Sequence, residues 1–288
     1  MKCACCRSTE IIPRPFGLDH YYGCIGCGFL FRSREGISDV RYDLINHYQE
    51  IDPHETVALS KQGFFNASLK YLSSQIRHRR NSLLDVGCGY GYFLELAMEQ
   101  GWQVSGIEIS GKAVRAARDK VGDKNIFHGS LIEAKYPDDS FDVVTLWDML
   151  DMSEDPFEEL RECYRIMKNG GKIGIRVRNA SFQKLLFRLF RPVLGITARL
   201  GIKHPFVFHL YCFTPASIYQ LLCRAGFARI RITNSPLTEG DPYGYSRTGW
   251  ATRIVKRMVY LFSRDVFRVT DGLRIIGPSL LVWAEKPS

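Results

Sequence analysis

The chain has 288 residues, of which 45% are hydrophobic and 24% are charged, so it can bury a sizeable core and is not a disordered chain. No apolar run reaches the 18 or so residues of a membrane span, so we expect no membrane-spanning helix. The net charge of +9 is uneven, because residues 181–288 carry 16 Lys and Arg against five acids, while residues 1–180 carry 23 against 25. We therefore expect the basic surface on the C-terminal part of the chain.

Two pairs of cysteines near the N-terminus have the spacing of a zinc ribbon. Cys3 and Cys6 form one C-x2-C pair, Cys24 and Cys27 form the other, and 17 residues separate the pairs. Two such hairpins present four thiolates to one tetrahedral ion. The sequence therefore predicts a structural Zn²⁺ site in a module of residues 1–35. Cys5 offers a further thiol, and reduced thiols without a metal are the alternative.

A disulfide framework is the less favoured use of the cysteines. Cys3 follows Met1 and Lys2 without an apolar leader, so we expect a reducing, cytoplasmic environment. The total of nine is odd. The four cysteines outside the module fall in segments that we expect to be buried: Cys88, Cys163, Cys212 and Cys223.

Residues 36–80 are expected to link this module to the rest of the chain. The stretch Phe64–Ile76 has helical character. Glycines and prolines are scattered along the sequence and do not cluster, which argues against a flexible linker between domains.

The stretch from Ser82 to Glu99, SLLDVGCGYGYFLELAME, predicts a strand, a sharp turn and a helix. The apolar run before Asp85 is typical of a buried parallel strand, and apolar residues recur at helical spacing after Gly91. Gly87, Gly89 and Gly91 allow positive φ angles and a close approach by a ligand. The free amides of the helix N-terminus point towards that ligand. We interpret this turn as a nucleoside cofactor site.

A second strand, Trp102–Ile109, ends in Glu108, which lies 21 residues after Gly87. Nucleotide-binding folds place a carboxylate at this spacing to bind ribose hydroxyls. A dinucleotide fingerprint would need glycine at position 92, where this chain has Tyr92.

The run from Asp85 to Gly91 followed by Glu108 closely resembles the cofactor motifs of class I S-adenosylmethionine-dependent methyltransferases. The resemblance covers about the middle two-thirds of the chain, through FDVVTLWDML (141–150), DPFEELRECYRIMKNGG (155–171), KIGIRV (172–177) and FTPASIYQLLCRAGF (213–227). It implies an α/β fold with a doubly wound, seven-stranded, mostly parallel sheet over residues 81–288, and the last strand over residues 279–287. Insertions are expected at about 178–212 and 235–278.

The resemblance also implies which residues bind S-adenosylmethionine. Glu108 would accept hydrogen bonds from both ribose hydroxyls, Ile109 would cover adenine, and Trp147 would lie beside the methionine, with core packing as its alternative. Ser130 stands where an acid or amide often contacts adenine. The complete predicted set is Asp85, Gly87, Cys88, Gly89, Gly91, Glu108, Ile109, Ser130, Leu131 and Trp147.

An obvious catalytic base is missing from the sequence. Many small-molecule members of the family have Glu-His after the fourth strand, where this chain has Asp151 and Met152. Methyl transfer is a direct displacement at a sulfonium carbon, so alignment and exclusion of water suffice for reactive nucleophiles. The candidate bases by location are Asp148, Asp151, His204, His209 and Tyr211, each of which has an ordinary structural role as its alternative.

Two C-terminal stretches are basic and amphipathic. Residues 181–203 place Leu185 and Leu189 on one helical face and Arg188 on another, and residues 250–269 repeat the arrangement with Phe262 and Arg257. Such helices can lie in the interface of an anionic membrane. A core-facing helix with a solvated charged face is the alternative.

Three functions fit these features. The first is O-methylation of a small or lipid-linked metabolite, such as a sugar, glycan or isoprenoid-type molecule, by a cytoplasmic enzyme with peripheral membrane contact. The second is an RNA methyltransferase that uses the zinc ribbon and the basic surface, although W-D-M-L at residues 147–150 differs from the N-P-P-Y or D-P-P-Y of base-amine enzymes. The third is an inactive cofactor-binding adaptor.

Overall fold

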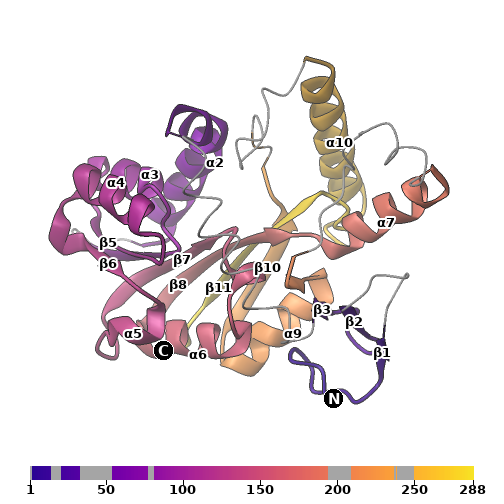
Figure 1. Cartoon of the computed structure of the whole chain (residues 1–288), viewed down its shortest axis with the longest axis horizontal. Helices are drawn as coiled ribbons and strands as arrows, with labels where there is room; N and C mark the ends of the chain where they lie inside the picture. The colour runs from indigo at the N-terminus through magenta and orange to yellow at the C-terminus, as the bar shows by residue number, and fades with distance from the viewer. Residues whose placement is uncertain are drawn as a thin grey trace.

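The computed structural model describes residues 2–13, 21–32, 54–76, 81–193, 209–236, 238 and 250–288. A seven-stranded sheet forms the centre of the molecule, in the order β10-β11-β8-β7-β4-β5-β6 (Figure 1). The strands are β4 (Ser82–Val86), β5 (Gln103–Glu108), β6 (Ile126–His128), β7 (Phe141–Trp147), β8 (Met167–Arg178), β10 (Ala228–Asn234) and β11 (Ser279–Glu285). The five strands from β4 to β8 are parallel, and β11 is antiparallel to both β8 and β10. This doubly wound sheet is the one that the sequence predicts.

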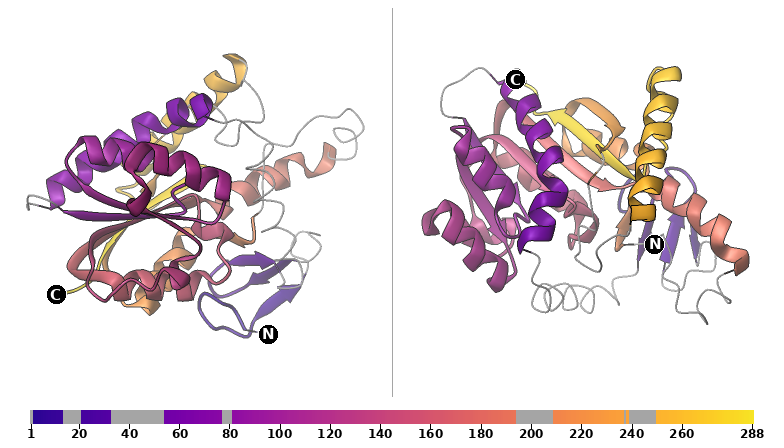
Figure 2. Two further views of the ribbon diagram at one scale, coloured as in Figure 1. Left: turned by 60° about the vertical axis from the view of Figure 1, so that its left-hand side comes forward. Right: turned by 90° about the horizontal axis from the view of Figure 1, so that it is seen from above.

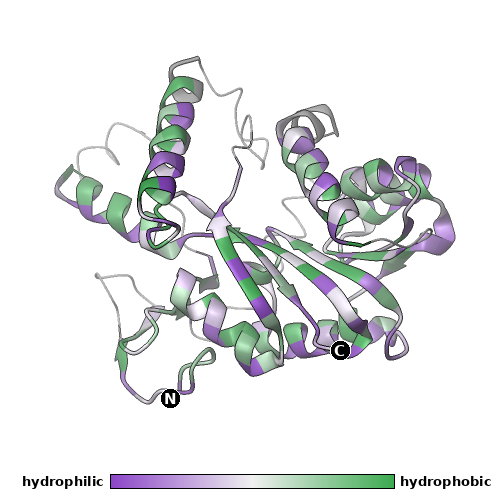
Figure 3. Cartoon of the chain, turned by 180° about the vertical axis from the view of Figure 1, so that it is seen from behind, coloured by the Kyte–Doolittle hydropathy of each residue, from purple (hydrophilic) through white to green (hydrophobic). Residues whose placement is uncertain are grey.

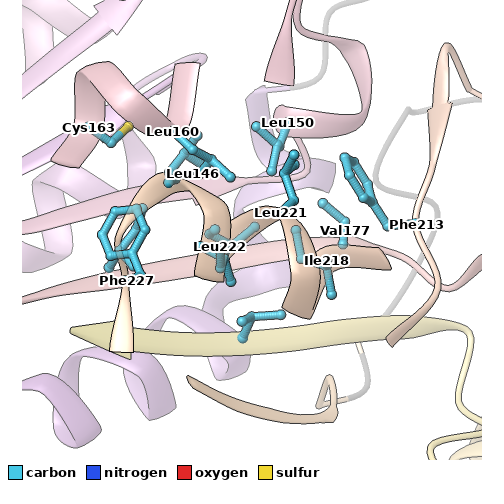
Figure 4. Packing of buried hydrophobic residues seen from close by; sticks show 14 of the residues in the cluster. Leu146, Leu150, Leu160, Cys163, Val177, Phe213, Ile218, Leu221, Leu222 and Phe227 are labelled. Atoms are coloured by element: carbon cyan, nitrogen blue, oxygen red, sulfur yellow. The ribbon is translucent and has the colours of Figure 1, made fainter. Parts of the chain in front are cut away.

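Helices cover both faces of the sheet, which explains why its strands are apolar on both sides. One face is covered by α2 (His54–Gln75), α3 (Tyr92–Glu99) and α4 (Gly111–Val121), and the other by α5 (Leu131–Ala134), α6 (Pro156–Ile166) and α9 (Pro215–Ala225) (Figure 1). Successive residues of β4 alternate between the two layers, since Leu83 packs in the cluster under α2 and α3 while Leu84 packs in the cluster under α6. Figure 4 shows α9 contributing Ile218, Leu221 and Leu222 to this second cluster.

Local sequence signals set several helix ends. Asp155 caps α6 by accepting hydrogen bonds from the amides of Phe157 and Glu158, as an N-cap side chain does. Thr214 and Ser217 form a capping box at the start of α9, with Pro215 in its first turn. Both helices are therefore encoded locally.

Some element bounds differ from the prediction. Helix α2 begins at His54, ten residues before the expected Phe64. The helix expected to run to Gly171 ends at Ile166, because Met167 pairs with Phe141 and already belongs to β8. Among the cysteines expected to be buried, Cys223 is exposed on α9.

The N-terminal module forms a second, four-stranded sheet of order β1-β2-β3-β9. Its strands are β1 (Ile11–Pro13), β2 (Tyr21–Cys24), β3 (Leu30–Arg32) and β9 (Tyr211–Cys212). The fourth strand thus comes from a segment about 180 residues further along the chain. The prediction ends the module at residue 35. Its sheet, however, also includes residues 211–212 from a later part of the chain.

Two helices project from the end of the molecule beside β10: α7 (Ala180–Phe190), continued by a 3-10 turn at Arg191–Val193, and α10 (Trp250–Val269) (Figures 1 and 2). Viewed from behind, both carry hydrophobic and hydrophilic residues side by side (Figure 3). Within the described part of the chain, no helix combines the length and hydropathy needed to span a bilayer. The stretch 194–203 of the first predicted amphipathic segment lies outside the described residues, as does the candidate base His204.

Candidate functional site

The glycine turn lies between β4 and α3, at the carboxyl edge of the parallel strands, and is tied to β5 by the amides of Gly87 and Cys88, which both donate to the Ile107 carbonyl. Gly91 has a φ of 78°, and a Cβ there would lie 3.0 Å from the Ala117 backbone, so the helices α3 and α4 require glycine at this position. At Gly89, also at positive φ, no atom lies within 4 Å of the equivalent point. The turn is therefore tightly packed on its protein side and open at Gly89, where a ligand can approach the backbone.

Glu108 is buried at the end of β5 and orders the turn through its carboxylate. Its Oε2 accepts a hydrogen bond from the Gly89 amide at 2.9 Å, and its Oε1 accepts from the amides of Ile109 and Ser110, each at 2.8 Å. Burial raises the pKa of this carboxyl, while the three amides oppose the shift. A carboxylate has about four lone-pair sites. A lone-pair site therefore remains on Oε2 for a ribose hydroxyl, and the predicted contact of Glu108 with both hydroxyls stays a prediction.

Asp85 lies in β4 and is only 2% exposed. Its Oδ1 accepts a hydrogen bond from the Thr145 hydroxyl at 2.6 Å. Burial raises the Asp85 pKa to about 7, against the effect of that hydrogen bond. The sequence analysis missed Thr145, although the signal is present, since parallel pairing of β4 with β7 sets Asp85 opposite Thr145.

Four of the predicted cofactor residues have other structural roles. The Ser130 hydroxyl donates to Glu133 and accepts from its amide in the capping box of α5. The side chains of Leu131 and Cys88 are buried in the two hydrophobic clusters. Trp147 packs edge-to-face against Phe93, Phe64 and Trp283, so its side chain adopts the core-packing alternative. The cofactor contacts of these four residues stay predictions. Ile109 is half-buried at the end of β5, next to Glu108.

A buried charge cluster, which the sequence analysis missed, follows β7. Asp148 accepts from Lys61 of α2 at 2.8 Å and forms an ion pair with Arg176 of β8. Burial alone would raise the Asp148 pKa, but Arg176 and Lys61 outweigh it and hold the pKa well below its usual range. A carboxylate bound by two cations is a poor proton acceptor. Asp148 therefore serves to fix this loop, in which it adopts a φ of 59°.

The other candidate bases lie close together behind this cluster. Asp151 is buried in the 3-10 turn η4 (Leu150–Met152), and the ring of His209, just before β9, contacts Met152 of the same turn. Burial raises the pKa of Asp151 and lowers the pKa of His209. The charge of His209 lowers the Asp151 pKa and the charge of Asp151 raises the His209 pKa, so each partly offsets the effect of burial on the other. The Tyr211 hydroxyl donates to the Glu154 carbonyl at 2.8 Å, which gives it a structural role.

The four predicted zinc ligands, Cys3, Cys6, Cys24 and Cys27, converge with their sulfur atoms all within 4.8 Å of one another. The Cys3–Cys27 distance is 3.7 Å and the Cys6–Cys24 distance is 3.4 Å. A tetrahedral Zn²⁺ with bonds of about 2.3 Å needs S···S edges of roughly 3.8 Å. The donor set therefore fits zinc. Cys5 is not one of these four, and its thiol donates to the Ser217 carbonyl of α9.

Comparison with known proteins gives the family. A family model described as a methyltransferase domain matches residues 60–232. The chain belongs to this family. The predicted family, that of the S-adenosylmethionine-dependent methyltransferases, and the predicted fold class are thereby confirmed.

Among curated relatives, the ubiquinone biosynthesis O-methyltransferase of Nitrosospira multiformis is 33% identical over 124 residues, which cover 41% of this chain and 52% of that protein. The protein of the same name from Thiobacillus denitrificans is 32% identical over 182 residues, covering 59% and 76%. The chain thus spans about half the length of the first relative and three quarters of the second.

Solved structures show the same fold. A Thermotoga maritima S-adenosylmethionine-dependent methyltransferase, described as a possible histamine N-methyltransferase, has a TM-score of 0.50 at 16% identity and covers 83% of this chain and 97% of its own. Geranyl diphosphate C-methyltransferase from Streptomyces coelicolor has a TM-score of 0.50 at 16% identity, with 82% and 85% covered. At such identities the likeness extends to the fold alone.

The role of Glu108 is tested by Glu108→Ala. We expect weaker S-adenosylmethionine binding, because a hydrogen bond to a charged acceptor contributes roughly 1.5–3 kcal/mol and the amides of the turn lose their acceptor. Isothermal titration calorimetry measures the affinity, with Glu99→Ala on the exposed end of α3 as the matched control. Equal affinity in the two variants contradicts the assignment.

Burial of Asp85 predicts a pH dependence of stability. The folded-state pKa of about 7 exceeds the ordinary 3.8, so the contribution of this residue is fully present below pH 4 and is lost as the pH rises through about 7. Asp85→Asn should remove a decline in unfolding free energy of up to about 4 kcal/mol between these values. Urea unfolding at each pH measures it, and Asp119→Asn, on the exposed side of α4, should retain the decline. An unchanged slope in Asp85→Asn refutes the prediction.

Cys24→Ser should lose zinc and destabilise the N-terminal module, since structural zinc contributes folding free energy directly. Elemental analysis of the purified protein measures the metal, and limited proteolysis measures the loosening. Cys223→Ser, which changes an exposed cysteine outside the cluster, should keep one zinc per chain. A full zinc complement in Cys24→Ser would falsify the ligand set.

Proposed function

We propose that the protein methylates a hydroxyl group of a lipid-linked acceptor, such as a sugar, glycan or isoprenoid-type molecule, at the surface of an anionic membrane. The names of the curated relatives favour oxygen as the acceptor atom. A structural neighbour named for geranyl diphosphate supports an isoprenoid-type molecule as one that this fold can accommodate. The observation that carries the proposal is the exposed apolar face of α10.

Helix α10 is attached to the sheet by one side only. The Asn234 side chain of β10 donates to the backbone carbonyl of Ser263, and Ser263 is buried. At about 100° per residue, the apolar residues away from Ser263 fall in an arc of about 120°. They are Ile254, Val255, Met258, Leu261, Phe262 and Val269, and all are exposed, Phe262 by 65% and Val269 by 84%. This exposure favours the membrane-surface reading of α10 over the core-facing alternative.

Arginines border the apolar arc of α10 along one edge. Arg257, Arg264 and Arg268 fall within the adjacent 60° or so of the helix circumference, and Arg264 also pairs with Asp265, which lies within the arc. Helix α7 repeats this division, with Leu185 and Leu189 exposed. An exposed apolar stripe with a basic border fits the interface of an anionic bilayer, where the apolar side chains enter the acyl boundary and the cations meet the headgroups.

RNA fits the same surface less well. Phosphate contacts need cations, but they do not need a row of exposed apolar side chains at their border. The adaptor alternative loses its main support, because alignment of donor and acceptor is sufficient for methyl transfer to many nucleophiles.

The acceptor class is tested with tritium-labelled S-adenosylmethionine, incubated with the purified protein and separate chloroform-soluble, aqueous and total RNA fractions of bacterial cells. Label in the chloroform-soluble fraction supports the proposal. Label confined to RNA overturns it, and cofactor binding without transfer to any fraction supports the adaptor.

Membrane contact is tested by flotation with vesicles of phosphatidylglycerol and phosphatidylcholine. Met258→Asp with Phe262→Asp should abolish flotation, and Arg257→Glu with Arg268→Glu should weaken it by roughly 1 kcal/mol or more per charge. The matched control is Arg115→Glu with Lys124→Glu, at exposed positions near α4. Equal flotation of all variants contradicts the contact, and a shift to dimers without flotation assigns the face to a second copy of the chain.

A further inference from the structure

The short segment before and within β9 is held by the zinc-ribbon module. Cys212 pairs with Leu30 and Tyr211 with Phe31 across the sheet, and the Arg32 amide donates to the Leu210 carbonyl at 2.8 Å. His209 is part of the same attachment, since the Tyr21 hydroxyl of β2 donates to its carbonyl at 3.1 Å. The position of His209 therefore depends on the ribbon strands β2 and β3.

The ribbon is in turn anchored beside its metal-binding loops. The Thr214 hydroxyl donates to the Cys27 carbonyl at 3.0 Å, and Lys184 of α7 donates to the Gly28 carbonyl at 2.7 Å. The ring of Phe29, which follows directly, stacks on Tyr211 of β9 with centroids 5.9 Å apart. Metal binding at Cys24 and Cys27 thus orders the backbone on which β9 is built.

The His209 ring contacts the loop that follows β7. A Cβ at Gly87 would lie 2.7 Å from Met149, so this loop packs directly on the glycine turn. Two residues further on, Asp151 is 2% exposed, and its Oδ1 has no hydrogen-bond partner in the described part of the chain. The His209 Nδ1 lies 2.6 Å from the Met152 sulfur. Asp151 and His209 thus come together one short loop away from the cofactor turn.

Burial, rather than the surrounding charges, holds the His209 pKa below its ordinary 6.5. Burial lowers its pKa, Asp151 and Asp148 of the η4 loop raise it, and Arg178 at the end of β8 lowers it. From the ribbon side, the Tyr21 hydroxyl and the Cys212 thiol of β9 both donate to the backbone carbonyl of His209. A neutral imidazole beside a carboxylate is able to accept a proton.

We propose that His209, which the zinc-ribbon sheet holds beside Asp151, accepts the proton of the acceptor hydroxyl during methyl transfer. The new bond joins the hydroxyl oxygen to the methyl carbon as the bond from that carbon to the sulfonium sulfur breaks. The electron pair of the broken bond stays on sulfur, which becomes the neutral thioether, and the proton passes to the imidazole and then to solvent. The inference rests on the proposed hydroxyl acceptor. It supplies from β9 the imidazole that the sequence lacks after β7.

The first experiment compares initial rates of label transfer to the chloroform-soluble fraction across pH. Wild-type rates should fall as the pH drops through the His209 pKa, below 6.5, because protonation removes the base. His209→Gln and His209→Ala should reduce the rate by roughly 10²–10⁴-fold and abolish this acid limb, with S-adenosylmethionine affinity unchanged by calorimetry. Asp151→Asn should shift the limb to lower pH, since it removes a charge that raises the His209 pKa.

The matched control is Glu159→Gln, which changes another buried acid with an oxygen lacking a partner in the described residues, on α6. It should keep the wild-type acid limb. The role of the ribbon is measured by NMR titration of ¹⁵N-labelled histidine in the full chain, with His209 assigned from His209→Gln. Cys24→Ser should move the His209 pKa up towards 6.5 as burial is lost, and Cys223→Ser should not.

The outcomes separate the two proposals. If wild type labels lipid and His209→Gln does so equally well with the same acid limb, the role of His209 is overturned. If Cys24→Ser loses zinc but leaves the His209 titration unchanged, the role of the ribbon is overturned. If wild type labels no lipid, the proposed acceptor is wrong. The pairing of His209 with Asp151 is then tested by NMR in Asp151→Asn. A lowered His209 pKa in this variant supports the pairing, and an unchanged one overturns it.

Discussion

Three carboxylates are buried at the carboxyl edge of one parallel sheet, and each needs its own donors because an ionised group removed from water is costly. Asp85 receives a hydroxyl, Glu108 receives three backbone amides, and Asp148 receives two cations. These partners come from β7, from the glycine turn and the residues after β5, and from α2 and β8. Because each acid bonds to partners on other elements, these contacts hold β7, β8, α2 and the residues after β5 in place around the cofactor turn.

The donors also give each acid a different chemistry. Burial raises the pKa of Asp85 to about 7, whereas Arg176 and Lys61 hold the pKa of Asp148 below its usual range. Asp148, paired with two cations, is a poor acceptor for a proton. This agrees with the proposal that the acceptor proton passes to His209, beside Asp151 of η4.

Sequence reasoning succeeded where a short segment determines the structure. The glycine turn, Glu108 and the four cysteines depend on local spacing, and the capped helices depend on local side chains. It failed where the interacting residues are far apart in the sequence and come together only in the folded chain. Lys61 and Arg176 lie 87 and 28 residues from Asp148, and periodicity does not reveal whether the apolar side of α10 meets protein or solvent. The direction of the Trp147 side chain likewise depends on packing against α2 and β11.

The two-residue strand β9 has a consequence for how the chain is made. The first three strands of the N-terminal module leave the ribosome well before the fourth, which follows about 180 residues later in the chain. Until then β3 is an unpaired sheet edge, which other strands can pair with. Binding of zinc during translation would keep the nascent ribbon compact over this interval, so metal supply is coupled to the yield of correctly assembled protein.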